Sequence, residues 1–424
     1  MKLTRWTCAA ALAAVLLAVH PAAAVDLPTA APAAVGLGRL ERIATWLRAE
    51  AEAKRLPGSV VMIARNGKVA YHEAFGVRDP ATGAPMQKDS IFRMYSMTKP
   101  VTAVAILMLM EEGKLRLADP VSRFLPALKA PKVITETVDA QGQHRSTTVP
   151  ADREITILDL LRHTAGLTYG VFGNSLVDQA MKTAGLNEPD MRLRWTDQKV
   201  VEELGKLPLL YQPGTQWQYS RATDVLLAVV EAVSGQRGDA FYEERIFKPL
   251  GMVDTSFNLP AEKLGRMAES GVDPDTGRPQ PLTDVTKTRL FLGGGEGLLS
   301  TASDYMKFAL MLANGGQLEG VRLLSHASVA LMSANHLPPG VGGGPNYLPG
   351  PGYGFGLTVA VRTEAGQSSV PGSVGEYNWG GYAGTKFWID PKERLVPILL
   401  IQAPLQSRNA GNSFRGLVYG SIAD

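Results

Sequence analysis

Strand-like segments lie at both ends of this chain, whereas its middle is mostly helical in pattern. Near the N-terminus, residues 59–64 and 69–75 are short runs rich in β-branched and aromatic side chains. Asn66-Gly67 joins them and is a strong hairpin signal. Three more strand-like segments follow near the C-terminus, at residues 356–361, 384–389 and 395–401. Strands at both ends predict one sheet built from the two chain ends and interrupted by a helical insertion.

The helical segments are predicted from the spacing of apolar residues. Residues 36–54 form an amphipathic pattern, and residues 101–110 form a long apolar run. Further helical segments punctuated by glycine and proline are expected at 158–161, 200–204, 225–233, 241–250 and, as a closing helix, 413–422. The Gly/Pro-rich stretch 338–354 is predicted to be a loop, and the chain has no internal repeats.

Composition places the chain among ordinary soluble globular proteins. Its 424 residues are 45% hydrophobic and 20% charged, which is enough for one large or two interleaved domains. The net charge of +3 is too small to indicate nucleic acid or an anionic membrane as a partner, and no lysine- or arginine-rich run changes that.

Residues 1–24 have the pattern of a secretory signal peptide. Lys2 and Arg5 precede an apolar run at residues 9–19, and small residues at 22–24 form a cleavage signal near Ala24. The run is too short for a membrane span. Cys8, the only cysteine, precedes the run, so cleavage would leave no thiol. We expect a mature chain of residues 25–424, secreted or periplasmic.

The run Ser96-Met97-Thr98-Lys99 carries the strongest chemical signal, because no other lysine in the chain has a serine three positions before it. Residues three apart on a helix share a face, so a helix start here would set the Ser96 hydroxyl beside the Lys99 amine. A serine needs a neighbouring base to become a nucleophile, and a desolvated lysine can be one. The alternative is an ordinary helix opening in which Ser96 is the N-cap.

Two later segments are candidate site components. Tyr219-Ser220 lies at a loop-to-helix junction, from which a phenol can reach a cleft or simply cap a core. Trp379-Gly380-Gly381 precedes a strand, and its glycines would allow close approach to the backbone, in a ligand site or in a bulge or turn.

Taken in order, these three motifs resemble the serine β-lactamase and penicillin-binding protein superfamily. The likeness is greatest to the class C-like branch that contains the family VIII carboxylesterases. Looser matches extend over most of the mature chain, at residues 161–167, 212–214, 293–304 and 388–391. The resemblance implies an α/β (α+β) β-lactamase/transpeptidase-like fold with an antiparallel sheet flanked by helices. Its α/β lobe would span about 30–105 and 290–424, and its helical lobe about 106–289.

The resemblance also implies roles for individual residues. Ser96 would be the acylated nucleophile, and Lys99 and Tyr219 would move its proton, with the choice of base left open. The N–H groups of Ser96 and Tyr382 would form the oxyanion hole. Such a donor is typically worth roughly 3 to 4 kcal/mol of transition-state stabilisation.

Two departures from the family pattern bear on the substrate. Trp379 stands where lactamases usually have the lysine of K-T-G, and Arg221 stands where they commonly have an asparagine. Both changes favour neutral carboxylic esters, with Trp379, Gly380, Gly381 and Arg221 as substrate-binding residues. Arg221 or Lys386 could still supply a cation, which leaves weak β-lactam binding or hydrolysis open.

The sequence therefore predicts a secreted serine hydrolase acting on short-chain or aryl esters. Alternatives with the same fold are a β-lactamase, a D-Ala-D-Ala carboxypeptidase or amide hydrolase, an acyltransferase, and a non-catalytic penicillin-sensing module. An α/β-hydrolase triad is disfavoured, because no serine has the G-x-S-x-G setting, and His163 and Asp224 are interpreted as structural. No metal pattern is present in the sequence, and we expect no cofactor.

Overall fold

A computed structural model describes residues 25–138, 144–344 and 346–423. The predicted signal peptide, residues 1–24, lies outside this part of the chain. Among the described residues, no helix combines the length and the apolar character that crossing a membrane requires.

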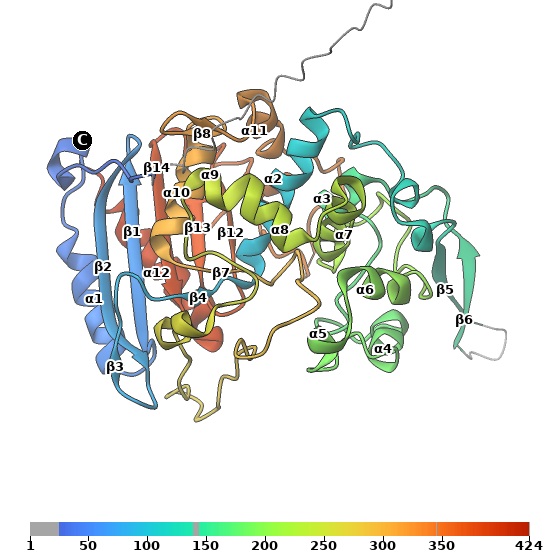
Figure 1. The fold of residues 1–424 in the computed structure, drawn as a ribbon, viewed down its shortest axis with the longest axis horizontal. Coiled ribbons are helices and arrows are strands. Elements are labelled where there is room, and N and C mark those ends of the chain that lie inside the picture. The colour runs from blue at the N-terminus through green and yellow to red at the C-terminus, as the bar shows by residue number, and fades with distance from the viewer. Residues whose placement is uncertain (1–24, 139–143, 345, 424) are drawn as a thin grey trace, which may run out of the picture.

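An eight-stranded sheet forms the centre of the molecule, in the order β10-β11-β12-β13-β14-β1-β2-β3. Every neighbouring pair is antiparallel. The strands are β1 (Gly58–Arg65), β2 (Lys68–Asp79), β3 (Ala84–Pro85), β10 (Tyr353–Phe355), β11 (Ala360–Arg362), β12 (Tyr377–Gly380), β13 (Lys386–Ile389) and β14 (Leu395–Ile401). Because β1 pairs with β14, the two chain ends meet in the middle of the sheet, blue beside red in Figure 1. The predicted sheet built from both ends is confirmed.

Helices cover both faces of this sheet, and the alternation of side chains in β1 shows which helix lies on which face. Val61 and Ile63 pack with helices α1 (Glu41–Glu52) and α12 (Ser407–Tyr419). Val60 and Met62 point to the other face and join the large core that includes α10 (Ala302–Ala313). Successive strand residues alternate between faces, so one strand serves both layers.

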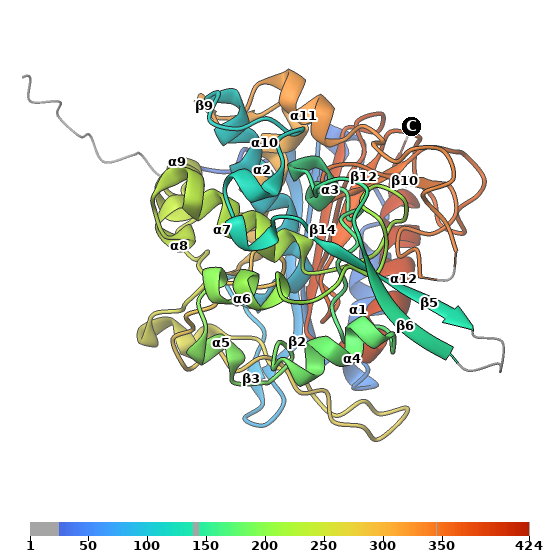
Figure 2. The same cartoon turned by 90° about the vertical axis from the view of Figure 1, so that its right-hand side faces the viewer.

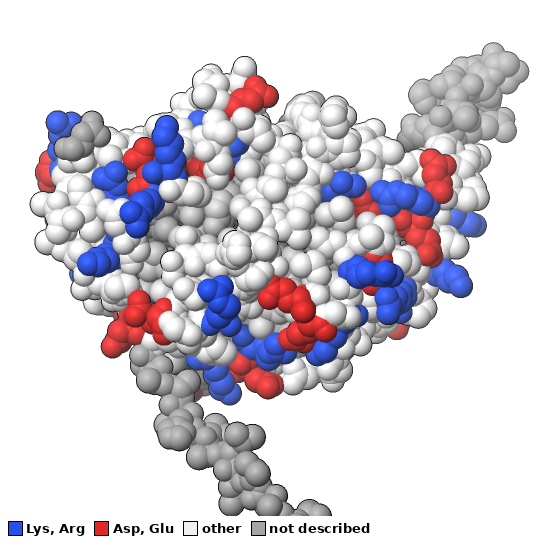
Figure 3. Space-filling view, turned by 90° about the horizontal axis from the view of Figure 1, so that it is seen from above, with Lys and Arg blue, Asp and Glu red and all other residues white. Residues whose placement is uncertain are grey.

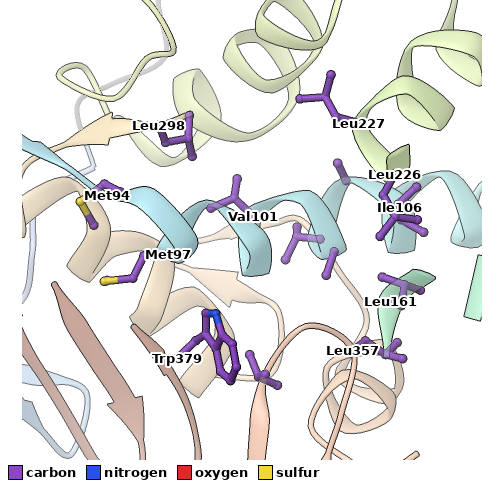
Figure 4. Close-up of a cluster of buried hydrophobic side chains, with 14 of the residues drawn as sticks. Met94, Met97, Val101, Ile106, Leu161, Leu226, Leu227, Leu298, Leu357 and Trp379 are labelled. Carbon is purple, nitrogen blue, oxygen red and sulfur yellow. The ribbon is translucent and has the colours of Figure 1, made fainter. Parts of the chain in front are cut away.

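Helix α2 (Thr98–Glu111) runs through the centre of the large core. Its residues from Thr98 to Leu109 are all buried, as expected for a helix that is apolar on every side. It packs against α7 (Ala222–Ser234) and lies beside Trp379, as Figure 4 shows. The first turn of α2 is therefore fixed from several directions at once.

Several of the remaining helices group with α7 in a second, mostly helical region beside the sheet, seen from another side in Figure 2. They are α3 (Ile157–Leu161), α4 (Leu176–Thr183), α5 (Met191–Arg194) and α6 (Asp197–Leu204). In Figure 1, α8 (Gly238–Tyr242) and α9 (Lys248–Leu250) lie in front of the sheet, and α11 (His326–Met332) lies above it. Short strand pairs complete the fold: β4 (Phe92–Arg93) with β7 (Leu299–Ser300), β5 (Lys132–Val138) with β6 (His144–Pro150), and β8 (Gln317–Leu318) with β9 (Val321–Arg322). The lobe boundaries given above remain predictions.

Several predicted elements need correction. The strand expected at 356–361 is mostly the connection between β10 and β11, because the chain turns at Thr358, whose φ is +67°. The helix expected at 241–250 is interrupted by a π-helical turn at Glu243–Phe247. The first amphipathic helix begins only at Glu41, and the β5–β6 hairpin and α10 were not predicted at all.

Candidate active site

Ser96 lies in a tight 3₁₀ turn, Tyr95–Met97, that leads directly into α2. It is the one residue of 91–100 that is not buried. Tyr95 adopts a left-handed φ of +45° just before it, and its hydroxyl accepts the Thr283 N–H at 3.0 Å. The N-cap residue of α2 is Met97, so Ser96 is not the helix cap. Its hydroxyl instead contacts Lys99 and Tyr219.

Lys99 is fully buried directly behind the Ser96 hydroxyl. Its Nζ lies 3.2 Å from Ser96 Oγ, 2.9 Å from the Tyr169 hydroxyl and 2.7 Å from the Gly295 carbonyl oxygen. It also lies 4.6 Å from the centroid of the Tyr219 ring, within cation–π range. Three acceptors match the three N–H bonds of an ammonium, and the rings exclude water from it.

Tyr219 completes the trio, because its hydroxyl donates to Ser96 Oγ at 2.6 Å. Its ring is 8% exposed and packs against aromatic neighbours that hold it in place. These neighbours are His163, Tyr169, Phe172, Trp217 and Trp379, with ring centroids 4.9 to 6.0 Å away. The structure thus brings together three residues that are 3 and 123 positions apart in the chain.

The end of β12 brings Trp379, Gly380 and Gly381 to the same place. A Cβ at Gly381 would lie 2.4 Å from the Met94 carbonyl oxygen, two residues before Ser96. The sequence suggested that something packs closely against these glycines. At Gly381 that close neighbour is the backbone of the protein itself, at Met94. Within the described residues, the N–H groups of Ser96 and Tyr382 donate to no protein acceptor, which suits the predicted oxyanion hole.

The two candidate cations are placed elsewhere. The Arg221 guanidinium is buried and bound to the Leu186 carbonyl oxygen at 2.8 Å and to Asp224 at 3.3 Å. This gives Arg221 a structural role, in contrast to the predicted substrate contact. Lys386 pairs with Gly380 across β12 and β13, so its side chain points to the α12 face. It packs there against Gly411, and desolvation, then Arg415 and Arg408, lower its pKa to about 8.

Tyr169 and Gly295 were missed by the sequence reasoning. Both contact Lys99, but they lie 70 and 196 residues away along the chain. Burial, then Tyr219, raises the pKa of Tyr169 well above 10, so it stays a neutral phenol. Each residue lay in or beside a loosely matching segment, 161–167 for Tyr169 and 293–304 for Gly295, and that was the only available signal.

Two buried carboxylates, Asp224 and Glu296, lie behind the Lys99 side of the site. The Asp224 carboxylate accepts the Gly295 N–H at 2.8 Å and thereby holds the carbonyl that binds Lys99. Burial raises the pKa of Asp224, and Arg221 opposes that shift. Burial also disfavours the charge of Glu296, but Arg192, 2.8 Å away, and then Arg221 lower its pKa to about 2. Glu296 is therefore an anion at neutral pH.

His163 is structural, as the sequence reasoning expected. It follows α3, is fully buried, and its Nδ1 lies 3.3 Å from the Ser220 hydroxyl. Burial, then the charge of Lys99, holds its pKa well below 6.5, so the imidazole is neutral.

Comparison with known proteins agrees with this geometry. Residues 43–419 match the family model described as Beta-lactamase. The chain is 36% identical to Protein Rv1367c of Mycobacterium tuberculosis, covering 84% of this chain and 88% of that protein. It is 31% identical to Esterase EstB of Burkholderia gladioli, covering 82% and 86%.

A solved structure, described as EstCE1, a hydrolase with promiscuous acyltransferase activity, superimposes with a TM-score of 0.77 at 28% identity. It covers 90% of this chain and 98% of that one. The match to the family model spans the sheet, α2 and all three motif segments. The chain therefore belongs to the Beta-lactamase family and has the β-lactamase/transpeptidase-like fold.

Proposed function

We propose that the protein is a serine carboxylesterase that works through an acyl-enzyme on Ser96. One observation carries the proposal: Ser96 Oγ lies within hydrogen-bond reach of both Lys99 Nζ and the Tyr219 hydroxyl. A partly exposed hydroxyl with two proton-transfer partners behind it is the arrangement that an activated nucleophile needs. The esterase named among the relatives supports the same reaction class.

In the reactive form we propose, the Lys99–Tyr219 pair has released one proton to solvent, so that one of the two groups can act as a base. Ser96 Oγ attacks the ester carbonyl carbon while its own proton passes to this pair. The carbonyl π electrons move onto the oxygen, where the N–H groups of Ser96 and Tyr382 hold the negative charge. The C–O bond to the alcohol then breaks, and the departing oxygen receives the proton. Water attacks the acyl-enzyme, the same pair takes and returns its proton, and the acid leaves.

Neutral esters suit this site better than anionic β-lactams. Trp379 contributes an apolar wall beside Tyr219, with ring centroids 5.6 Å apart. Arg221 and Lys386 offer no free cation there, for the reasons given above. With neither cation free at the site, a substrate carboxylate would lack a partner, and we propose small uncharged alkyl or aryl esters. On the face seen in Figure 3, which does not show the site, charged side chains of both signs are interspersed.

The test compares p-nitrophenyl butyrate with a chromogenic cephalosporin. We expect faster turnover of the ester, loss of about 10³-fold or more in kcat for Ser96→Ala, and little change for the matched Ser303→Ala. A fluorophosphonate should label one peptide, that containing Ser96, as seen by mass spectrometry. Faster cephalosporin turnover, or parental ester activity in Ser96→Ala, would overturn the proposal.

Acyl transfer to an alcohol is a second candidate, favoured by the activity named for EstCE1. An alcohol would take the place of water in the second half-reaction. Product analysis with added butanol should then show butyl ester formed at the expense of free acid, and unchanged acid yield would exclude it.

We also propose export of the protein, from the signal-peptide pattern of residues 1–24. N-terminal sequencing of the protein made in its host should find a mature chain that starts near Val25. A chain beginning at Met1 would contradict export.

A further inference from the structure

Phe172 is the exposed outer edge of the aromatic cluster that surrounds the candidate site. Its side chain is 61% exposed, whereas Tyr169 and Tyr219 are 6% and 8% exposed. The Phe172 ring nevertheless packs on both, with centroids 5.5 Å from Tyr169 and 6.0 Å from Tyr219. An exposed aromatic ring beside a reactive group is a surface that an apolar ligand can cover.

The loop that carries Phe172 is anchored at its base. Asp178 accepts the Thr168 hydroxyl at 2.7 Å on one side of the loop. On the other side it accepts the Ser175 N–H at 2.9 Å and the Ser175 hydroxyl at 2.7 Å, in the capping box of α4. Both ends of the loop are thus tied to one carboxylate, and Phe172 projects from a fixed base.

The direction of proton transfer shows which half of an ester lies near Phe172. The departing alcohol oxygen must come within hydrogen-bond reach of the Tyr219 hydroxyl or Lys99 Nζ to receive its proton. The carbonyl oxygen instead points to the N–H groups of Ser96 and Tyr382. The alcohol half is therefore the half that lies against Tyr219 and the ring that borders it.

We propose that Phe172 forms the subsite for the alcohol half of the substrate and selects esters of flat, apolar alcohols such as phenols and naphthols. This inference rests on the esterase function proposed above. The ring of such an alcohol would stack on Phe172 and remove apolar surface from water, a gain that a methyl group is too small to provide. In this proposal the acyl half points away from the Phe172 ring.

The experiment measures kcat/KM for Phe172→Ala with two sets of esters. In the first, the acid is butyric acid and the alcohol is methanol or 1-naphthol. In the second, the alcohol is 1-naphthol and the acid is acetic, butyric or hexanoic. Each value is divided by that of the parent protein with the same ester, which removes differences in intrinsic reactivity.

We expect about a tenfold loss with every naphthyl ester and less than about a twofold change with methyl butyrate. Phe172→Tyr should keep parental values. Val253→Ala, which truncates an apolar side chain that is 74% exposed and remote in sequence, should change neither set. The rate of acyl-enzyme hydrolysis should be unchanged in Phe172→Ala, because the alcohol has already left, whereas a misfolded site would alter it.

A loss that grows with acyl length, an equal loss for methyl and naphthyl esters, or no loss would overturn the assignment of Phe172. These outcomes differ from failure of the proposed function. If Ser96→Ala is inactive and the loss of kcat/KM in Phe172→Ala grows with acyl length, the assignment of Phe172 to the alcohol subsite is wrong but the esterase function stands. If Ser96→Ala still turns over esters, the esterase mechanism itself is wrong.

Discussion

At the scale of single residues, the site depends on places where a side chain is missing. A Cβ at Gly295 would lie 3.0 Å from the Tyr169 hydroxyl and 3.2 Å from Lys99 Nζ, so any larger residue would crowd the lysine. Gly381 plays the same part on the opposite side, where β12 passes the backbone just before Ser96. Because neither glycine has a side chain, the segments that carry Gly295 and Gly381 can pack closely against the segment that carries Ser96 and Lys99.

Substitution of Gly381 by alanine should therefore damage catalysis more than its size suggests. The new Cβ would meet the Met94 carbonyl oxygen at 2.4 Å and Thr385 Oγ1 at 2.3 Å, so the end of β12 must move away from Ser96. We expect a loss of about 1 to 3 kcal/mol in the free energy of unfolding, and at least about a tenfold fall in kcat/KM. Gly380→Ala, with nearest atoms at 3.1 and 3.3 Å, should lose much less. Equal losses for the two variants would contradict this account.

Tyr169→Phe tests the placement of Lys99. The change removes the hydroxyl 2.9 Å from Lys99 Nζ and keeps the ring. A hydrogen bond to a charged group is worth about 1.5 to 3 kcal/mol, so kcat/KM should fall by roughly 10- to 100-fold. Tyr71→Phe is the matched control, because the Tyr71 hydroxyl has no hydrogen-bond partner in the described part of the chain. Parental kinetics for Tyr169→Phe would show that this contact does not matter.

At the scale of elements, a buried cluster of charged side chains connects α12 to strands β11 and β12. Strand β12 ends at the candidate site. Glu376, immediately before β12, is fully buried and accepts Arg362 Nε of β11 at 3.2 Å. Arg415 and Tyr419 of α12 donate to the same carboxylate. One carboxylate thus joins two strands and the closing helix.

Replacing Glu376 with glutamine should lower stability strongly, because it leaves Arg362 and Arg415 buried without their shared counter-ion. Removing one partner of a buried pair typically costs about 3 to 5 kcal/mol. Urea unfolding would measure this loss, with the exposed Glu364→Gln as the control, for which we expect less than about 0.5 kcal/mol. A loss below about 1 kcal/mol for Glu376→Gln would mean that the cluster contributes little.

How far apart the interacting residues lie in the chain explains what the sequence could and could not predict. The pairing of Ser96 with Lys99 was predictable because only three residues separate them, across the 3₁₀ turn and the start of α2. The β1–β2 hairpin was predictable because its turn residues are local. Lys386 was not, because the face it occupies depends on its register with Gly380 in a neighbouring strand. Tyr169 is held at the site by contacts between distant segments, which no local pattern reveals.

At the scale of the whole molecule, the sheet and the helical region meet at a core where His163 lies uncharged. Its ring packs on Tyr219 and Phe355, with centroids 4.9 and 5.7 Å away, and it supports the phenol of the trio. A neutral, fully buried histidine links the stability of the molecule to pH. Protonating it in place would put a second cation near Lys99 without water to solvate it.

The sign of this pH dependence follows from the lowered pKa. Unfolded, His163 titrates near 6.5, whereas burial and then Lys99 hold its folded pKa well below that value. As pH falls below about 6.5, the unfolded chain therefore takes up a proton that the folded protein refuses, and the free energy of unfolding falls. Between pH 8 and pH 5 this one group can remove at most about 2 kcal/mol, the limit that the unfolded pKa sets.

His163→Phe is less stable at pH 8 but lacks this group. Its deficit relative to the parent should therefore shrink as pH falls to 5 in urea unfolding, by at most about 2 kcal/mol. The exposed His326→Gln should keep the parental pH dependence. A deficit for His163→Phe that stays constant between pH 8 and pH 5 would show that His163 takes up its proton as readily in the folded protein as in the unfolded chain.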